Sequence, residues 1–149
     1  MVSGTPANDD GTDAGPDALA EALRAEHAAV YGYEYLGGTA DAQGRRERAL
    51  DEAAKHKALR DALHAAAVER GIDPPPALAS YPLPEGHGDG DVDAFAAELE
   101  QTTARAYLWL TSSDDAELRW TAGRALQETT VRALTWGGDL DALPGFEEA

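Results

Sequence analysis

Apolar residues recur every three or four positions in four stretches of the chain, the spacing of an α-helix with one buried face. This pattern predicts helices over residues 17–36, 42–70 and 91–110, with a fourth running from about 114 to the glycine pair at 137–138. No stretch shows the period-two alternation of a half-buried strand. The sequence therefore predicts an all-α protein.

Glycine, proline and aspartate mark the expected helix ends. We expect the first helix to stop at Gly37 and Gly38, and the second to end at Gly71 ahead of three consecutive prolines. Asp91 is a plausible N-cap for the third helix. Asp114 and Glu117 have the spacing of a capping box for the fourth helix.

The connections between the helices predict the topology. The first and last connections are short, which favours two antiparallel hairpins. The connection 71–90 is long and rich in proline and glycine, so it can run the length of a helix. Such a crossover makes the second and third helices parallel, as in a ferritin-like four-helix bundle. We expect this bundle over residues 17–138, a disordered segment over 1–16 and a tail over 139–149.

The charge of the chain excludes some partners. The formal net charge is -16, whereas nucleic acids and anionic membranes are recognised by basic surfaces. The chain has no cysteine, which excludes disulfides and thiolate metal sites. It has no apolar run long enough to span a membrane and no signal peptide at its N-terminus. We therefore expect a cytoplasmic protein that binds neither nucleic acid nor membrane, with a trimmed export signal as the alternative.

Each predicted helix carries ionisable residues on or beside its apolar stripe, near mid-length. Isolated buried charges are costly, so we expect these side chains to meet in one polar cluster. The residues are Glu26 on the first helix, Glu52 and His56 on the second, Glu100 on the third, and Glu128 and Arg132 on the fourth.

Two interpretations of this cluster follow. In the first, Arg132 and His56 neutralise Glu26, Glu100 and Glu128 in a closed network of salt bridges. Arg132 is the expected partner of Glu26, and His56 is the second choice. In the alternative, carboxylates and a neutral imidazole bind two iron or manganese ions through Glu26, Glu52, His56, Glu100 and Glu128. Arginine cannot ligate a metal, which favours the first interpretation.

The chain resembles a ferritin-like family of bacterial proteins classified only as a domain of unknown function. The resemblance covers about residues 17–138 and rests on the segments EALRAEHAAVYGYEYLG, AAKHKALRDAL, PPPALASYPLP, FAAELEQTTARAYLWL and LQETTVRALTW. Ferritin-like di-iron proteins use two glutamates and two Glu-x-x-His motifs. Here Glu52 and His56 are spaced one residue too far apart, and Val131 stands where the second histidine belongs.

These observations favour a non-catalytic structural, binding or assembly module with no metal cofactor. The alternative is a divergent di-metal oxidoreductase, and a third possibility is a small-ligand binder that uses a cleft between helices. Four large side chains are expected to point outward and to form a homodimer interface. They are Tyr31, Tyr35, Trp120 and Leu134.

Overall fold

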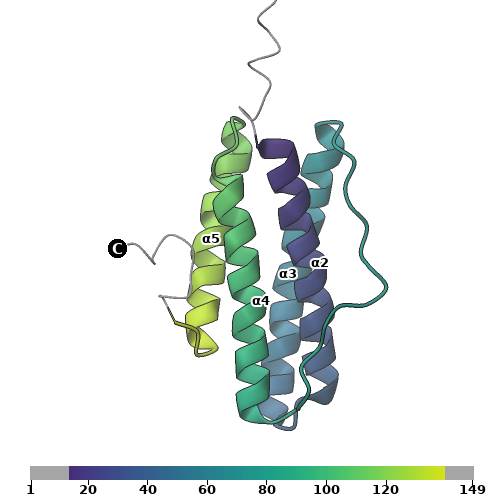
Figure 1. The fold of residues 1–149 in the computed structure, drawn as a ribbon, viewed down its shortest axis with the longest axis vertical. Helices are drawn as coiled ribbons and strands as arrows, with labels where there is room; N and C mark the ends of the chain where they lie inside the picture. The colour runs from purple at the N-terminus through teal and green to yellow at the C-terminus, as the bar shows by residue number, and fades with distance from the viewer. Residues whose placement is uncertain (1–13, 140–149) are drawn as a thin grey trace, which may run out of the picture.

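The computed structural model describes residues 14–139, which form a bundle of four helices (Figure 1). The helices are α2 (Gly15–Thr39), α3 (Gln43–Glu69), α4 (Asp89–Leu110) and α5 (Ala116–Thr135). The described part of the chain contains no strand. The predicted all-α class and the predicted number of helices are therefore confirmed.

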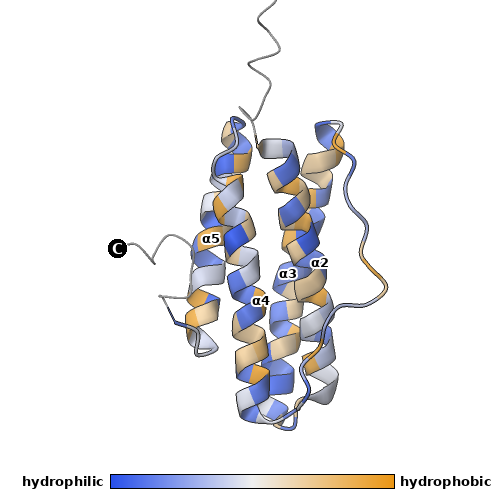
Figure 2. Cartoon of the chain, in the orientation of Figure 1, coloured by the Kyte–Doolittle hydropathy of each residue, from blue (hydrophilic) through white to orange (hydrophobic). Residues whose placement is uncertain are grey.

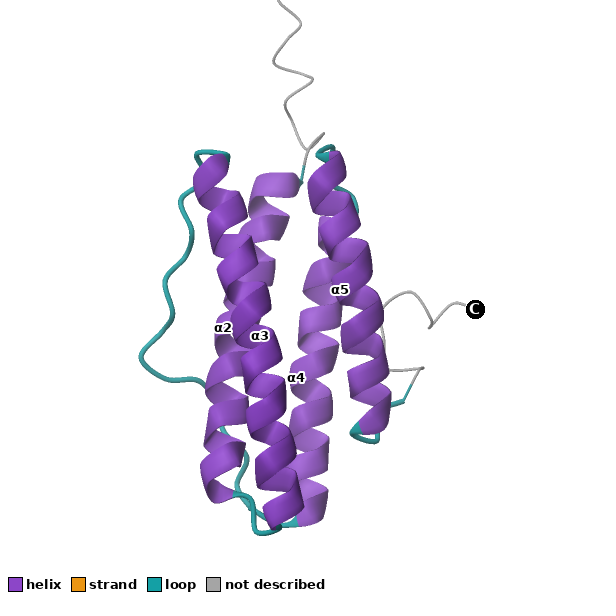
Figure 3. Ribbon diagram, turned by 180° about the vertical axis from the view of Figure 1, so that it is seen from behind, coloured by secondary structure: helices purple, strands orange, loops and turns teal. Residues whose placement is uncertain are grey.

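Contacts at the ends of the helices establish the topology. Arg45 at the start of α3 forms a salt bridge with Asp93 at the start of α4, at 2.8 Å. Arg70, directly after the end of α3, pairs with Asp115 at the start of α5, at 2.7 Å. Helices α3 and α4 are therefore parallel, as predicted, and two antiparallel hairpins are joined by one long crossover. The crossover runs outside the bundle along its length (Figure 3).

Three predicted helix ends need correction. Helix α2 does not stop at Gly37 and Gly38 but continues to Thr39, whose hydroxyl donates to the carbonyl of Tyr35. Helix α4 begins at Asp89, so Asp91 lies inside its first turn and does not cap it. The N-cap of α5 is Asp115 and not Asp114, because its carboxylate accepts from the backbone N–H groups of residues 117 and 118.

Gly71 does end its helix as predicted. Its φ of 69° lies in the left-handed region, where a side chain is strained. At the other end of the domain, α2 already begins at Gly15 with Pro16 in its first turn, so these two residues of the expected N-terminal segment are helical. Residues 1–13 of that segment, and the tail after residue 139, lie outside the described residues.

The apolar core consists of two main clusters, one toward each end of the bundle. One is formed by the first half of α2, the C-terminal halves of α3 and α4, and the N-terminal half of α5. The other joins the second half of α2 to the N-terminal halves of α3 and α4 and to Trp136. Figure 2 shows apolar and polar residues alternating along every helix, as expected for helices with one buried face. Between the two clusters lie the inward-facing polar residues.

The crossover covers two of the side chains expected on the surface. The rings of Tyr31 and Tyr81 lie 5.3 Å apart, and those of Tyr35 and His87 lie 6.1 Å apart. Both tyrosines are therefore only partly exposed, because the crossover covers side chains that were expected to be open to a partner. Trp120 and Leu134 on α5 are 64% and 40% exposed, as expected. None of the described helices is long and apolar enough to cross a membrane.

Candidate functional site

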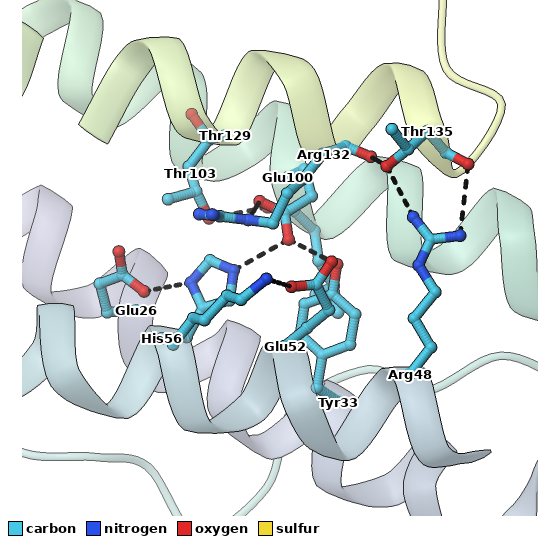
Figure 4. A network of polar contacts seen from close by, with 12 residues as sticks. Glu26, Tyr33, Arg48, Glu52, His56, Glu100, Thr103, Thr129, Arg132 and Thr135 are labelled. Carbon is cyan, nitrogen blue, oxygen red and sulfur yellow. Dashed lines mark hydrogen bonds and ion pairs between the residues drawn. The ribbon is translucent and has the colours of Figure 1, made fainter. Parts of the chain in front are cut away.

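One residue from each helix meets at the middle of the bundle. Glu26, His56 and Glu100 are completely buried, and Arg132 is 9% exposed. Each is placed there because it falls on or beside the apolar stripe of its helix, one turn from residues such as Leu23 that form the core. Figure 4 shows the four side chains pointing toward one another from α2, α3, α4 and α5.

His56 lies between two carboxylates. Its Nδ1 is 2.5 Å from Glu26 Oε1, and its Nε2 is 2.9 Å from Glu100 Oε2. Only the protonated ring can donate from both nitrogens at once. Burial lowers the pKa of His56, but the hydrogen bonds and charges of Glu100 and Glu26 outweigh burial and raise that pKa to about 9. At neutral pH the geometry therefore holds an imidazolium ion.

Two buried tyrosines that were not among the predicted cluster residues complete the environment of the carboxylates. Tyr33 donates to Glu100 Oε2 at 2.5 Å, and Tyr107 donates to Glu26 Oε2 at 2.6 Å. Burial and the adjacent carboxylates raise the pKa of both phenols well above the ordinary value. Their place on or beside an apolar stripe was a usable signal, because a buried tyrosine hydroxyl usually finds a partner.

Arg132 pairs with Glu100 and not with Glu26, which corrects the predicted partner. Its Nε lies 3.2 Å from Glu100 Oε1. Both oxygens of Glu26 already accept hydrogen bonds, from His56 and Tyr107, so the second-choice partner His56 is the observed one. Burial raises the pKa of Glu100, but His56 and Arg132 outweigh burial and lower that pKa.

The two remaining candidate glutamates lie at the edge of the cluster or outside it. Glu52 is 4% exposed, and Lys55 Nζ lies 3.3 Å from its Oε1, although this contact lacks hydrogen-bond geometry. Glu128 is exposed and faces Arg124 at 3.9 Å. Its predicted place in the buried cluster is wrong, because it lies one position from the buried Thr129 and its side chain is turned about 100° away around the helix.

The two carboxylates of the central cluster are balanced in charge and satisfied in hydrogen bonding, while Arg132 Nη2 and, at the edge, Glu52 Oε1 are buried without a hydrogen-bond partner. The charges of Glu26 and Glu100 balance those of His56 and Arg132, and every oxygen of the two carboxylates accepts a hydrogen bond. A metal would need these oxygens and a deprotonated His56. Within residues 14–139, no group of three or more histidine, aspartate or glutamate side chains is arranged to hold a metal ion. The arrangement suits a fixed network of ion pairs.

The fold and this site together define a class: an all-α bundle of two hairpins with a layer of buried charge at mid-length. The chain belongs to the family described as Domain of unknown function (DUF4439), whose model matches residues 18–148. The family expected from the sequence, one defined only as a domain of unknown function, is thus confirmed.

A solved structure supports the fold. The chain is similar to the crystal structure of a conserved hypothetical protein, rv2844, from Mycobacterium tuberculosis. The two sequences are 30% identical. The similarity covers 83% of this chain and 87% of that chain, with a TM-score of 0.76. A comparison with curated proteins finds no match.

Proposed function

We propose that this protein is a non-catalytic structural and assembly module whose buried cluster fixes the arrangement of its helices. The observation that supports this most strongly is His56, whose two ring nitrogens both face carboxylates that have no oxygen free. A catalytic acid, base or metal ligand needs an atom open to a substrate or an ion. The described geometry leaves no such atom at the centre of this cluster.

The cluster can act as a device that specifies helix register. Each helix contributes one charged residue, and a shift of one helix by a turn would leave a charge buried without its partner. Removing one partner of a buried ion pair typically costs about 3–5 kcal/mol. The network therefore disfavours alternative packings of helices that are rich in small alanine side chains, such as α3 with Ala49, Ala53 and Ala67 in its core.

The same residues argue against the di-metal alternative. Glu128 lies on the surface, His56 would have to lose its proton, and Arg132 would keep a fixed positive charge beside the ions. We infer that the protein uses no metal cofactor and is not an oxidoreductase.

Elemental analysis of protein purified without chelator, followed by anaerobic titration with Fe(II), tests this inference. We expect no stoichiometric iron or manganese and no saturable binding of Fe(II). The control variant Glu128→Ala should behave like the wild type. Binding of about two equivalents of iron, retained in Glu128→Ala and lost in Glu26→Ala, would establish a di-metal site and overturn the proposal.

The assembly part of the proposal rests on the outer face of α5. Trp120, Val131 and Leu134 are 64%, 59% and 40% exposed. At 100° per residue they lie within about 60° of one another around the helix, so they form one stripe, which Gln127 and the Arg124 stacked on Trp120 interrupt. Exposed apolar side chains gathered on one face mark interaction sites in soluble proteins. We propose that a second copy of the chain packs on this stripe, which replaces the predicted interface that included Tyr31 and Tyr35.

A further inference from the structure

Helices α3 and α5 leave a groove between them beside the buried cluster. The close helix packing is between α2 and α3, α2 and α4, and α4 and α5, so the fourth side of the bundle is the loosest. The groove has a volume of about 500 Å³ and is lined by Lys55, Ala58, Leu59, Glu128 and Arg132. This volume falls within the range of small-molecule sites, roughly 300–1,000 Å³.

Two cations line this groove from opposite helices, and neither is fully satisfied. Lys55 on α3 is largely exposed and forms an ion pair with Glu52 at 3.3 Å, without hydrogen-bond geometry, so its donors remain available. Arg132 on α5 donates one hydrogen bond to the described residues, from Nε to Glu100. Its Nη2 is buried without a partner, which is costly for a charged donor. Nη2 itself is closed to the groove, but an anion there would supply acceptors to Lys55 and to the 11% of the Arg132 side chain that is exposed.

The remaining walls define the rest of the ligand. Ala58 and Leu59 form an apolar surface on α3, next to the two cations. Glu128 is the one acidic lining residue, and it is drawn toward Arg124 on the surface of α5. A small ligand with a negative head and an apolar body therefore matches the groove better than a cation or a bare inorganic anion.

We propose that the groove between α3 and α5 binds a small monocarboxylate, with its carboxylate between Lys55 and Arg132 and its apolar body against Ala58 and Leu59. The net charge of -16 repels anions from the molecule as a whole, so binding here would be local and specific. Screening at physiological salt weakens the long-range repulsion more than it weakens a contact pair at a partly buried site.

Three six-carbon probes separate the charge from the apolar body: hexanoate, 1-hexanol and hexylamine. Each is titrated at pH 7 into the full chain and followed by NMR shifts of the α3 and α5 amides. We expect saturable binding of hexanoate and at least about tenfold weaker binding of hexanol, because a carboxylate accepts charge-assisted hydrogen bonds that are stronger than those of a neutral hydroxyl. Hexylamine should bind most weakly.

Variants assign the binding to this groove without touching the buried network. Lys55→Met should weaken hexanoate binding about tenfold, and Ala58→Trp should abolish it by filling the groove. The matched control is Lys57→Met, because Lys57 lies on the same helix but pairs with Glu34 on α2. It should leave hexanoate binding unchanged.

Three results would overturn the proposal: no saturable hexanoate binding, hexylamine binding as tight as hexanoate, or equal binding by wild type and Lys55→Met. These results are independent of the metal titration. A failure of the monocarboxylate site leaves the closed network intact, and discovery of bound iron would not by itself create or remove binding of hexanoate in the groove.

Discussion

At the scale of single residues, burial normally keeps a histidine neutral, but His56 has a carboxylate at each ring nitrogen. The two carboxylates raise its pKa to about 9, so it joins the cluster as a cation. A neutral histidine would be a potential metal ligand, whereas a charged one is a salt-bridge partner. The protonation state of this one ring thus decides between the two interpretations that the sequence leaves open.

Coupling between Glu26 and His56 is the first prediction. The variants Glu26→Leu and His56→Leu should each lower the free energy of unfolding by several kcal/mol, because each leaves buried charge unpaired. In the double variant, the decrease in the free energy of unfolding should be smaller than the sum of the two single decreases by at least about 1 kcal/mol. Chemical denaturation of the four proteins measures this coupling.

The control is a second double-mutant cycle, which combines Glu128→Leu with His56→Leu. Glu128 is exposed and pairs with Arg124, so its effect should add to that of His56. Equal coupling in both cycles, or simple additivity of the Glu26 cycle, would contradict the assigned ion pair.

The second prediction concerns pH. The pKa of His56 rises from 6.5 in the unfolded chain to about 9 in the folded protein. Its contribution to stability is therefore fully present below pH 6.5 and is lost as the pH rises through 9. Between pH 7 and 9 the free energy of unfolding should fall by about 1 kcal/mol per pH unit.

Denaturation at several pH values measures this slope, which should persist in His64→Gln, since His64 is exposed. It should be absent in His56→Gln. A wild-type stability that stays constant from pH 7 to 9 would rule out the protonated histidine.

At the scale of helices, the sequence predicted which segments are helical but not every end. Gly37 and Gly71 look alike in the sequence, and only Gly71 stops a helix. A β-carbon at Gly37 would collide with the side chain of Leu50 on α3, which packs over this glycine. The role of Gly37 depends on a contact between two helices, which the sequence around Gly37 cannot reveal. Gly71 ends α3 through its own backbone, which a local pattern does reveal.

Two alanine substitutions form the third prediction. Gly123 lies inside α5, with no neighbouring atom near the position of a β-carbon, so Gly123→Ala should stabilise the protein by about 0.5–1 kcal/mol. Gly71→Ala should destabilise it by about 1–2 kcal/mol, because its φ is positive. Thermal unfolding of both variants measures the difference. If both substitutions shift the melting temperature in the same direction, the backbone conformations assigned to Gly71 and Gly123 are wrong.

At the scale of the whole molecule, the sequence located the polar layer but not its pairing. Helical periodicity placed Glu26, His56, Glu100 and Arg132 on inner faces, and all four are buried. The partners depend on how the helices slide and rotate against one another, which periodicity within one helix does not determine. The same limit explains Glu128, because a residue at the edge of a stripe turns inward or outward with a small rotation of its helix.

Self-association is the fourth prediction. Light scattering after size exclusion should give the mass of a dimer at high protein concentration. Trp120→Glu should shift the protein to monomer by placing a charge on the apolar stripe. Leu78→Glu is the control, because Leu78 on the crossover is equally exposed, at 64%. A monomer at every concentration, or equal loss of dimer in both variants, would remove this interface.

The most direct test of the closed network is the protonation state of His56 in the folded protein, followed by ¹⁵N NMR of the imidazole from pH 6 to pH 10. The assignment comes from His56→Gln. The network requires that both ring nitrogens of His56 carry a proton at pH 7. The ring should lose one of these two protons near pH 9. A neutral ring with one unprotonated nitrogen at pH 7 would contradict the network and restore His56 as a candidate metal ligand.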